Sequence, residues 1–220
     1  MALVSVTDAA GRLSVSSRRV QQLVRAGELQ SPARGVVEAA SVESYLAYRG
    51  EPGRRTWSEP TAWGAVAILA GDSPTWMGAP QRSRLKSRVR ELSPADLVER
   101  SRGRARVLRF AGHRSAGDRL RSALVTTGDG AQSLGLVAVE RVDGYLDPAS
   151  LDEVARRYGL SRNDEGMFVL RTTTFDLDIV ARLASEGTVL AALDLAGSLD
   201  VRERRAGLDG LTNVLEGMSG

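Results

Sequence analysis

Residues 16–27 decide how the N-terminal part of the chain is interpreted, and they read Ser16-Ser17-Arg18-Arg19-Val20-Gln21-Gln22-Leu23-Val24-Arg25-Ala26-Gly27. Ser16 is a preferred N-cap residue, and glycine suits the left-handed position after a helix end. Val20, Leu23 and Val24 recur at the spacing of one buried helix face. The stretch therefore predicts a short amphipathic helix. Its outward face carries Arg18, Gln22 and Arg25, with Ser17, Arg19 and Gln21 on the flanks.

The sequence on both sides of this helix predicts further short elements. Residues 6–13 read as a two-turn helix capped by Thr7, with Val6 as a hydrophobic staple. Residues 28–30 and 35–38 are short strand candidates around the turn 31–34, and Ser41 is expected to cap a third helix. The order helix, turn, helix, hairpin, helix predicts a winged helix-turn-helix over residues 1–50.

The outward face of the second helix has side chains that can recognise bases. Arginine pairs with the O6 and N7 atoms of guanine, and glutamine pairs with the N6 and N7 atoms of adenine. We therefore expect Arg18, Gln22 and Arg25 to read bases in the major groove of duplex DNA. The residues expected to contact the DNA backbone or the flanks of the site are Ser17, Arg19, Gln21 and Arg34, the last at the hairpin tip.

The run from Val6 to Leu29, followed by the hairpin and residues 41–46, resembles the excisionase/MerR-type DNA-binding module. The resemblance implies that the helix beginning near Ser16 enters the major groove. It also implies that the hairpin tip near Arg34 touches the backbone or the minor groove. This hairpin has fewer basic residues than many wings of that family.

Charge is distributed unevenly along the 220 residues, although the formal net charge is only +3. Residues 1–130 carry 21 basic and 12 acidic residues, and residues 131–220 carry 9 and 15, so the two parts are +9 and −6. This split indicates a polyanion-binding front and a back with another role. Because 29 of the 30 basic residues are arginine, a GC-rich genome alone can account for their abundance, and placement is the stronger evidence.

Composition excludes several classes of site and protein. The absence of cysteine excludes disulfides, thiolate metal sites and a cysteine nucleophile, and fits a reducing cytoplasm. The single histidine, His113, cannot build a multi-histidine metal site and is expected in a loop or at a helix start. The N-terminus lacks a signal-peptide pattern, and the apolar window 63–70 is far shorter than the ~20 residues of a membrane span. We therefore expect a cytoplasmic protein without membrane contact, metal or cofactor.

The remaining sequence predicts two more regions after a linker at 49–55, which gives an α+β protein overall. Residues 56–128 form a mainly helical basic region, and residues 129–220 form an acidic mixed α/β region that binds a partner. Trp57, Trp63 and Trp76 are expected in the core. A basic helix over 80–92 fits a solvated surface and phosphate contact about equally well. The other expected elements are a helix from Ser58 to Gly71, a helix from Ser93, a hairpin or strand at 102–110, a strand at 136–142, a helix from Asp147, a strand at 167–172, a helix at 177–184, a strand or buried helix at 188–195, and a helix from Val201.

Four segments resemble actinobacterial antitoxins of the AbiEi type, and they are residues 57–63, 143–148, 190–196 and 200–207. The resemblance implies a transcriptional regulator whose N-terminal winged helix binds the operator of its own operon. It also implies a nucleotidyltransferase-type toxin as the protein partner. Many AbiEi proteins have a winged helix of another subtype. A homodimer is a further expected partner, because single winged helices usually gain operator affinity as dimers or on paired sites.

Two alternatives of other classes remain open. An excisionase-like architectural factor would bend DNA and need no toxin. An enzyme would use Asp176 and Asp178, which are spaced like a magnesium-binding pair, although such pairs also serve as helix caps. We assign no catalytic residue from the sequence.

Overall fold

The computed structural model describes residues 2–49, 56–135 and 141–218. The chain divides into two compact units, Met1–Gly50 and Glu51–Gly220, which we call unit 1 and unit 2. Helices predominate in both, and each contains a β-sheet, so the fold is mixed α+β. Within the described ranges, no helix combines the length and the apolar character needed to cross a membrane.

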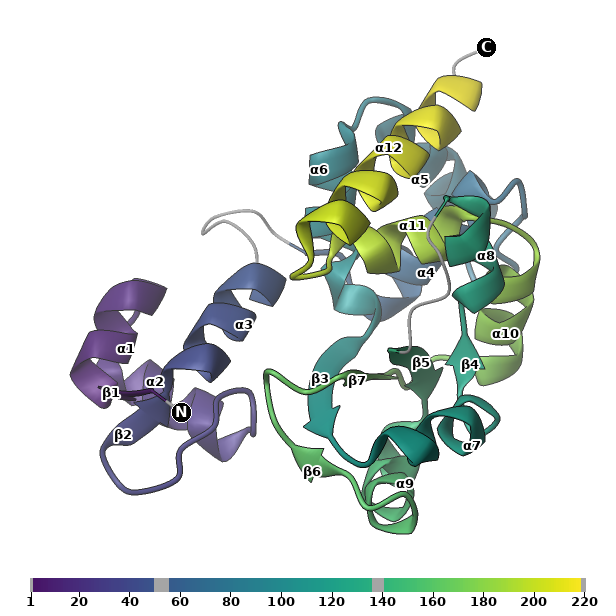
Figure 1. Cartoon of the computed structure of the whole chain (residues 1–220). Helices are drawn as coiled ribbons and strands as arrows, with labels where there is room; N and C mark the ends of the chain where they lie inside the picture. The colour runs from purple at the N-terminus through teal and green to yellow at the C-terminus, as the bar shows by residue number, and fades with distance from the viewer. Residues whose placement is uncertain (1, 50–55, 136–140, 219–220) are drawn as a thin grey trace. The chain divides into compact units, whose positions relative to one another are not determined.

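In residues 2–49, unit 1 is built from three helices and a two-stranded antiparallel sheet around one small core (Figure 1). The core is formed by small and aliphatic side chains from every element, among them Leu13, Val20, Leu23 and Val37. The elements are β1 (Leu3–Ser5), α1 (Val6–Leu13), α2 (Ser17–Arg25), β2 (Val36–Glu38) and α3 (Ala39–Arg49).

The sheet of unit 1 differs from the expected hairpin. Residues 28–30 form no strand, and β2 pairs with β1, with Val37 opposite Val4. The chain between α2 and β2 is held by the Glu38 N–H, which donates to the Gln30 carbonyl at 2.9 Å. β2 therefore pairs with a strand from the beginning of the chain, while Gln30 contacts the other edge of β2 without forming a strand.

Two predicted caps in unit 1 are also wrong. Ser5, rather than Thr7, caps α1, because its hydroxyl accepts the Asp8 N–H at 3.0 Å. Ser41 lies inside α3 and accepts the Gln30 N–H at 2.7 Å, so it secures the connection after α2 instead of starting a helix.

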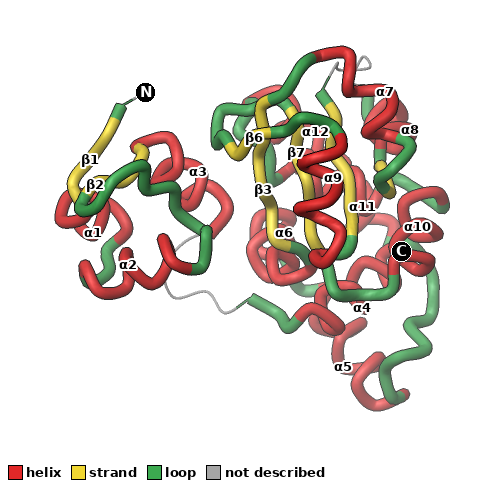
Figure 2. The backbone as a smooth tube through the Cα atoms, turned by 90° about the horizontal axis from the view of Figure 1, so that it is seen from below, coloured by secondary structure: helices red, strands yellow, loops and turns green. Residues whose placement is uncertain are grey.

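Within the described residues of unit 2, five strands form a sheet in the order β4-β5-β7-β3-β6, in which β5 and β7 are parallel and the other neighbours are antiparallel. Figure 2 shows helices on both sides of this sheet. The strands are β3 (Arg106–Ala111), β4 (Val125–Thr126), β5 (Val142–Leu146), β6 (Ser161–Arg162) and β7 (Phe168–Thr172). The helices are α4 (Glu59–Leu69), α5 (Ala79–Arg90), α6 (Pro94–Ser101), α7 (Gly117–Arg121), α8 (Gly128–Ser133), α9 (Leu151–Arg157), α10 (Leu177–Ser185), α11 (Val189–Ala196) and α12 (Val201–Gly217), with short 3-10 turns at 102–104, 114–116 and 148–150.

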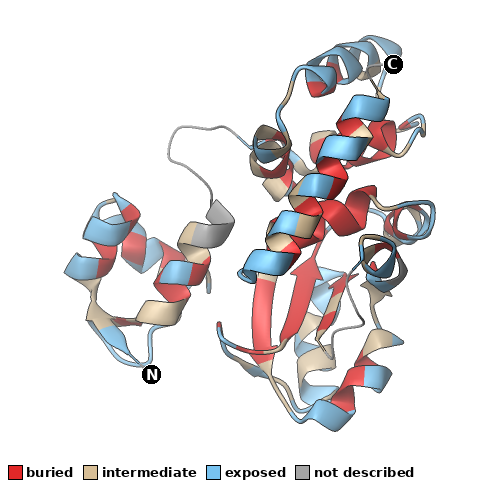
Figure 3. Ribbon diagram, turned by 45° about the horizontal axis from the view of Figure 1, so that its top comes forward, coloured by how far each residue is buried: buried red, intermediate tan, exposed pale blue. Residues whose placement is uncertain are grey.

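The two faces of this sheet have different neighbours because side chains alternate along each strand. Leu108, Phe168 and Leu170 lie on one face and pack with residues of α7 and α9. On the other face Tyr145 packs with a larger apolar cluster from α4, α6, α10, α11 and α12. Figure 3 shows the central strands as buried between these layers.

The expected boundary between residues 56–128 and 129–220 is wrong, because both regions form one sheet. Strand β3 from the first region pairs antiparallel with β7 from the second, with Leu108 opposite Leu170. The core is shared in the same way, since Trp63 contacts Tyr145 and Phe175. The charge split at residue 130 therefore falls inside one folded unit.

Most helices of unit 2 lie where the sequence predicts them. Residues 189–196 are a buried helix rather than a strand, and the three tryptophans are buried or half-buried in the core. Gly71 follows α4 with a φ of +83°, as its position after a helix end predicts. Of the strand expected at 136–142, residues 136–140 lie outside the described residues, and Val142 begins β5.

Candidate nucleic-acid interface

Helix α2 is fixed to α1 by a tight turn. Ser14 ends α1 with a φ of +52°, and its N–H points back to the carbonyls of Ala10 and Gly11. Val15 N–H also donates to the Ala10 carbonyl, at 3.0 Å. Ser16 then caps α2, because its hydroxyl accepts the Arg19 N–H at 3.2 Å. This confirms the predicted cap and places α2 directly after the turn.

The inner face of α2 is apolar, and its far end stops in the predicted way. Val20 and Leu23 are buried against Leu13 of α1 and the rest of the unit 1 core. Gly27 follows the helix with a φ of +66°, which glycine adopts without strain. The rotation of α2 about its axis is therefore set by the core, and this determines which side chains face solvent.

All seven residues that the sequence assigns to DNA contact are exposed. Six of them lie on α2, and the angular spacing of a helix puts Arg18, Gln22 and Arg25 in one stripe opposite the buried residues. The other three residues on α2 are Ser17, Arg19 and Gln21. Arg19 also donates to the Gln22 carboxamide oxygen at 3.4 Å, so the two side chains lie together on the outer surface.

The exposed surface of α2 is electropositive. The helix contains three arginines and no acidic residue. None of these arginines makes an ion pair within residues 2–49, whereas Arg12 on α1 pairs with Glu43 at 3.2 Å. Unit 1 as a whole has six basic and four acidic residues, a net charge of only +2. Its positive character is therefore concentrated on α2.

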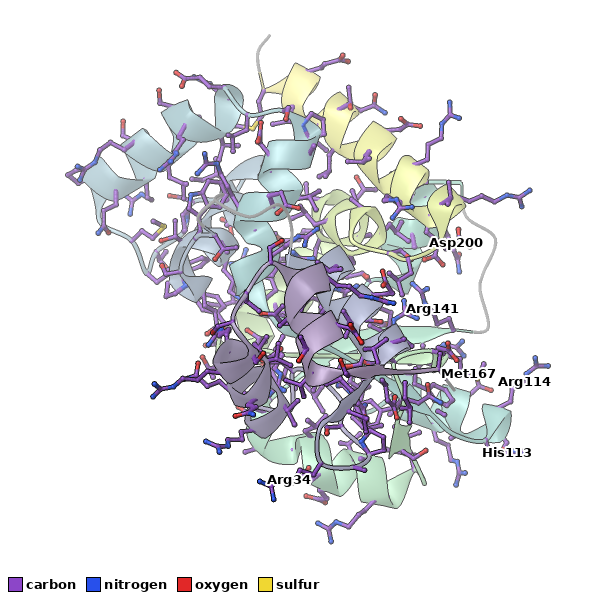
Figure 4. The ribbon with its side chains drawn as sticks, turned by 90° about the vertical axis from the view of Figure 1, so that its left-hand side faces the viewer. Arg34, His113, Arg114, Arg141, Met167 and Asp200 are labelled. Atoms are coloured by element: carbon purple, nitrogen blue, oxygen red, sulfur yellow. The ribbon has the colours of Figure 1, made fainter. Side chains whose placement is uncertain are left out.

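Arg34 lies in the loop between α2 and β2. An isolated bridge between Ala33 and Val36 closes a turn around it, and Gly35 has a φ of +88°. Figure 4 shows the Arg34 side chain extending away from the loop. The structure thus places Arg34 in a tight exposed turn, but not in the hairpin that we expected.

Two groups considered for catalysis or metal binding have structural roles. Asp176 caps α10, because one of its oxygens accepts the N–H groups of Asp178 and Ile179. His113 starts a 3-10 turn and accepts the Ser115 N–H at 3.2 Å, which agrees with the expected helix-start position. Among the described residues there is no group of three acidic or histidine side chains that could hold a metal ion.

Unit 2 contains a buried polar cluster that the sequence interpretation missed. Asp194 on α11 is 3% exposed and lies between two buried arginines. One of its oxygens is 2.6 Å from an Arg104 nitrogen, accepts the Tyr145 hydroxyl at 2.6 Å, and is 3.4 Å from Arg171. Its other oxygen accepts the Thr127 hydroxyl at 3.3 Å.

The cluster continues toward the start of α12. Arg171 binds Asp143 through two hydrogen bonds of 2.6 and 2.9 Å, and Arg141 pairs with Glu203 at 2.7 Å. Glu203 also accepts a hydrogen bond from Ser198. The three arginines and three carboxylates balance, so the cluster joins the sheet to α11 and α12 without an excess of charge.

The surroundings shift the pKa of three cluster members. Burial raises the pKa of Tyr145, so its hydroxyl remains protonated and donates to Asp194. Burial alone would lower the pKa of Arg104 and Arg171. The neighbouring Tyr145 and Asp194 hold the pKa of Arg104 above its ordinary value, and Asp143 and Asp194 do the same for Arg171.

A signal for this cluster was present in the sequence. Asp194 is the only charged residue in the apolar run of residues 189–196, and Arg171 interrupts a buried strand. Charged residues are rarely fully buried unless they are paired. Two such residues in separate apolar elements therefore indicate an ion pair, although only the fold identifies Arg104 and Tyr145 as the partners.

Comparisons with known proteins add no relative. The chain matches no family model, no curated protein and no solved structure.

Proposed function

We propose that the protein is a DNA-binding transcriptional regulator that reads its operator with α2. One observation carries the proposal: Arg18, Gln22 and Arg25 form a single exposed stripe on a helix that has no acidic residue. This stripe has the arginine donors that recognise guanine and the glutamine donor and acceptor that recognise adenine in the major groove. Its position on the second helix of a helix-turn-helix pair is the one that recognition helices occupy.

The way α2 is held also supports the proposal. Its capped N-terminus and its buried Val20 and Leu23 fix the helix axis and rotation. Side chains on a rigid helix make base contacts with less loss of conformational freedom than side chains on a loop. The free N–H groups at the start of α2, next to Ser17, suit a phosphate oxygen.

The proposal is tested with the triple variant Arg18→Ala, Gln22→Ala, Arg25→Ala. The probe is duplex DNA from immediately upstream of the gene, titrated in a fluorescence anisotropy or gel-shift assay against an unrelated duplex of equal length. Each lost bidentate base contact should weaken specific binding by about 1–3 kcal/mol. Because alanine is the best helix former, α2 remains helical in the variant.

Two matched controls sharpen this test. Gln21→Ala removes the same chemical group as Gln22→Ala, but from the flank of the helix, and should leave sequence preference unchanged. Arg12→Ala removes an arginine that is already paired with Glu43. If the triple variant binds the upstream duplex as tightly as the original protein, the assignment of α2 is wrong.

The more specific proposal is that the regulator is an antitoxin whose partner is a nucleotidyltransferase-type toxin. It rests on the AbiEi resemblance of four segments in unit 2, which meet around one core. Tyr145 stacks edge-on against Trp63 at 5.5 Å and donates to Asp194, while Gly207 of α12 lies against the backbone of α11. Because these residues are buried, the resemblance concerns the scaffold, and toxin contacts must come from other, exposed residues.

Co-expression tests the antitoxin proposal separately. The neighbouring gene is expressed with and without this chain, and growth is measured. Rescue of growth by both the full chain and the α2 triple variant supports neutralisation through unit 2. An absence of rescue by the full chain refutes the antitoxin proposal and leaves DNA binding as a separate question. An excisionase-like factor would instead bend the DNA it binds, which circular-permutation gel shifts detect.

A further inference from the structure

Helix α5 of unit 2 is strongly cationic. Its twelve residues include five basic side chains and no acidic one. Leu85 and Val89 are buried against the core that α4 dominates, and this fixes which faces of α5 point outward. The exposed basic residues are Arg84, Lys86, Arg88 and Arg90, and Arg82 is half-buried.

These basic side chains have no acidic partner within the described residues. Arg82 donates to the Met77 carbonyl at 2.5 Å, and Arg84 donates to the Pro80 carbonyl at 3.2 Å. The side chains of Lys86, Arg88 and Arg90 make no hydrogen bond or ion pair to any described residue. By contrast, Arg182 elsewhere in unit 2 pairs with both Asp72 and Glu186.

The requirements of the helix itself do not account for this charge. Arg84 and Arg88 are four residues apart, as are Lys86 and Arg90, and like charges at this spacing destabilise a helix by about 0.2–0.5 kcal/mol a pair. Cations in the last turn interact favourably with the helix dipole, which covers Arg88 and Arg90. The same effect does not extend to Arg84 and Lys86 in the middle of the helix.

Unit 1 offers few cations for the DNA backbone. Arg18, Arg19, Arg25 and Arg34 are its exposed arginines that make no ion pair among the described residues, and two of them are assigned to bases. Proteins with strong salt-dependent DNA binding commonly make about 6–10 phosphate contacts. An additional set of phosphate-binding side chains would supply the difference.

We propose that α5 is a second DNA-contacting surface, which binds the phosphates of duplex DNA without reading sequence. The inference rests on the proposed function, since α2 supplies the sequence recognition to which α5 adds affinity. Exposed arginine and lysine heads suit phosphate oxygens, and α5 carries no aromatic side chain on which the bases of a single strand could stack. These features favour duplex DNA over single-stranded RNA.

The test compares two full-length variants with equal changes in net charge. The first is Lys86→Gln, Arg88→Gln, Arg90→Gln, which leaves Arg82 and Arg84 to their backbone contacts. The second is Arg119→Gln, Arg156→Gln, Arg202→Gln, which removes three exposed arginines from α7, α9 and α12 of the same unit. Glutamine keeps helix propensity close to that of lysine and arginine, and thermal unfolding verifies that both variants are folded.

Binding is measured over a range of salt concentrations on three probes: the upstream duplex, an unrelated duplex and single-stranded polyuridine RNA. We expect the α5 variant to lose affinity for both duplexes by the same factor. The slope of log K against log salt should become less steep by about 2–3, since each phosphate contact contributes ~0.9. The scattered variant should retain most of the original slope.

Three outcomes of the binding measurements overturn the inference, and a fourth comes from a co-precipitation assay. The three are an unchanged slope in the α5 variant, an equal change in both variants, and a loss confined to the RNA probe. A loss limited to co-precipitation with the neighbouring gene's product, with intact DNA binding, would assign α5 to a protein partner and equally refute it. If the α2 triple variant binds the duplexes normally while the α5 variant binds them more weakly, α2 is not the recognition helix. The assignment of α5 to phosphate contact is then still supported.

Discussion

Replacing Asp194 with asparagine should strongly lower the free energy of unfolding of unit 2. The substitution preserves the size of the side chain but removes its negative charge. Arg171, which is 4% exposed, would keep its ion pair with Asp143, but Arg104, which is 5% exposed, would lose the carboxylate with which it pairs. Neither guanidinium can lose its proton, so a buried positive charge would remain without compensation.

The expected magnitude follows from the contacts of Asp194. Its carboxylate takes part in two short contacts of 2.6 Å, with Arg104 and with the Tyr145 hydroxyl, and in longer ones with Arg171 and Thr127. Removing one partner of a buried ion pair typically costs about 3–5 kcal/mol. This cost is a large part of the free energy of unfolding of a whole domain, which is ~5–15 kcal/mol. High salt should restore little of the lost free energy of unfolding, because salt screens buried charges only weakly.

Tryptophan fluorescence during denaturant unfolding measures this change in unit 2 alone. Trp57, Trp63 and Trp76 all lie in unit 2, and Trp63 packs directly on Tyr145. The control is Asp209→Asn on α12, whose carboxylate is 71% exposed and 3.9 Å from Arg205. This exposed change should alter the free energy of unfolding by less than about 0.5 kcal/mol.

A double-mutant cycle with Arg104→Met tests the assignment of the pair. The two single changes should not add, and their coupling should lie within about 0.5–3 kcal/mol. If Asp194→Asn lowers the free energy of unfolding by less than about 1 kcal/mol, the buried arginines are stabilised by something other than this carboxylate. The reasoning about the cluster would then be refuted.

Three further predictions concern separate parts of the fold. Gly207→Ala should lower stability by about 1–3 kcal/mol, because its Cβ would lie 2.3 Å from the Ala196 backbone nitrogen; Gly217→Ala on the same helix, where the space is open, should be harmless in the same melt. The pKa of Asp72 is lowered below its ordinary 3.8 by the hydrogen bond from Arg182, so its contribution to stability is present above pH 3.8 and is lost as the pH falls below it. Asp72→Asn should therefore destabilise unit 2 at neutral pH, with the difference from the original protein vanishing in acid. Ser14→Val should lower the protection of α2 amides from hydrogen exchange, because β-branched residues are strained at a φ of +52°. Ser14→Gly should preserve this protection. Equal protection in both variants would contradict the prediction.

Local sequence signals identified most of the helices correctly. Ser16 and Gly27 mark the start and end of α2, and Ser93 caps α6 as predicted, with its hydroxyl accepting the Asp96 N–H. These signals work because a cap and a left-handed residue act within a few positions of each other. The exposure of Arg18 was also predictable, since the apolar spacing of α2 fixes its buried side.

Long-range pairing accounts for the errors in strand partners and in the domain boundary. The first strand of unit 1 is only Leu3–Ser5, which has no turn signal beside it, and its partner Val36–Glu38 lies beyond both α1 and α2 in the sequence. The domain boundary expected near residue 129 was wrong for the same reason, because β3 and β7 are neighbours in the sheet but far apart in sequence. The location of Asp194 next to Tyr145 likewise depends on how α11 packs on the sheet. The residue pattern of one element does not indicate which distant element it contacts.

Strand β1 determines where a fragment of unit 1 can begin. A fragment that starts at Val6, the first residue of the first helix, would lack the three-residue partner of β2 and the Ser5 hydroxyl that caps α1. The Ala39 N–H, which donates to the Ala2 carbonyl at 2.9 Å, would lose its acceptor as well. Weak DNA binding by such a fragment would therefore report an incomplete fold rather than the affinity of α2. An affinity tag joined directly to Leu3 would crowd the same edge, so a tag at the other end of the chain is the better choice.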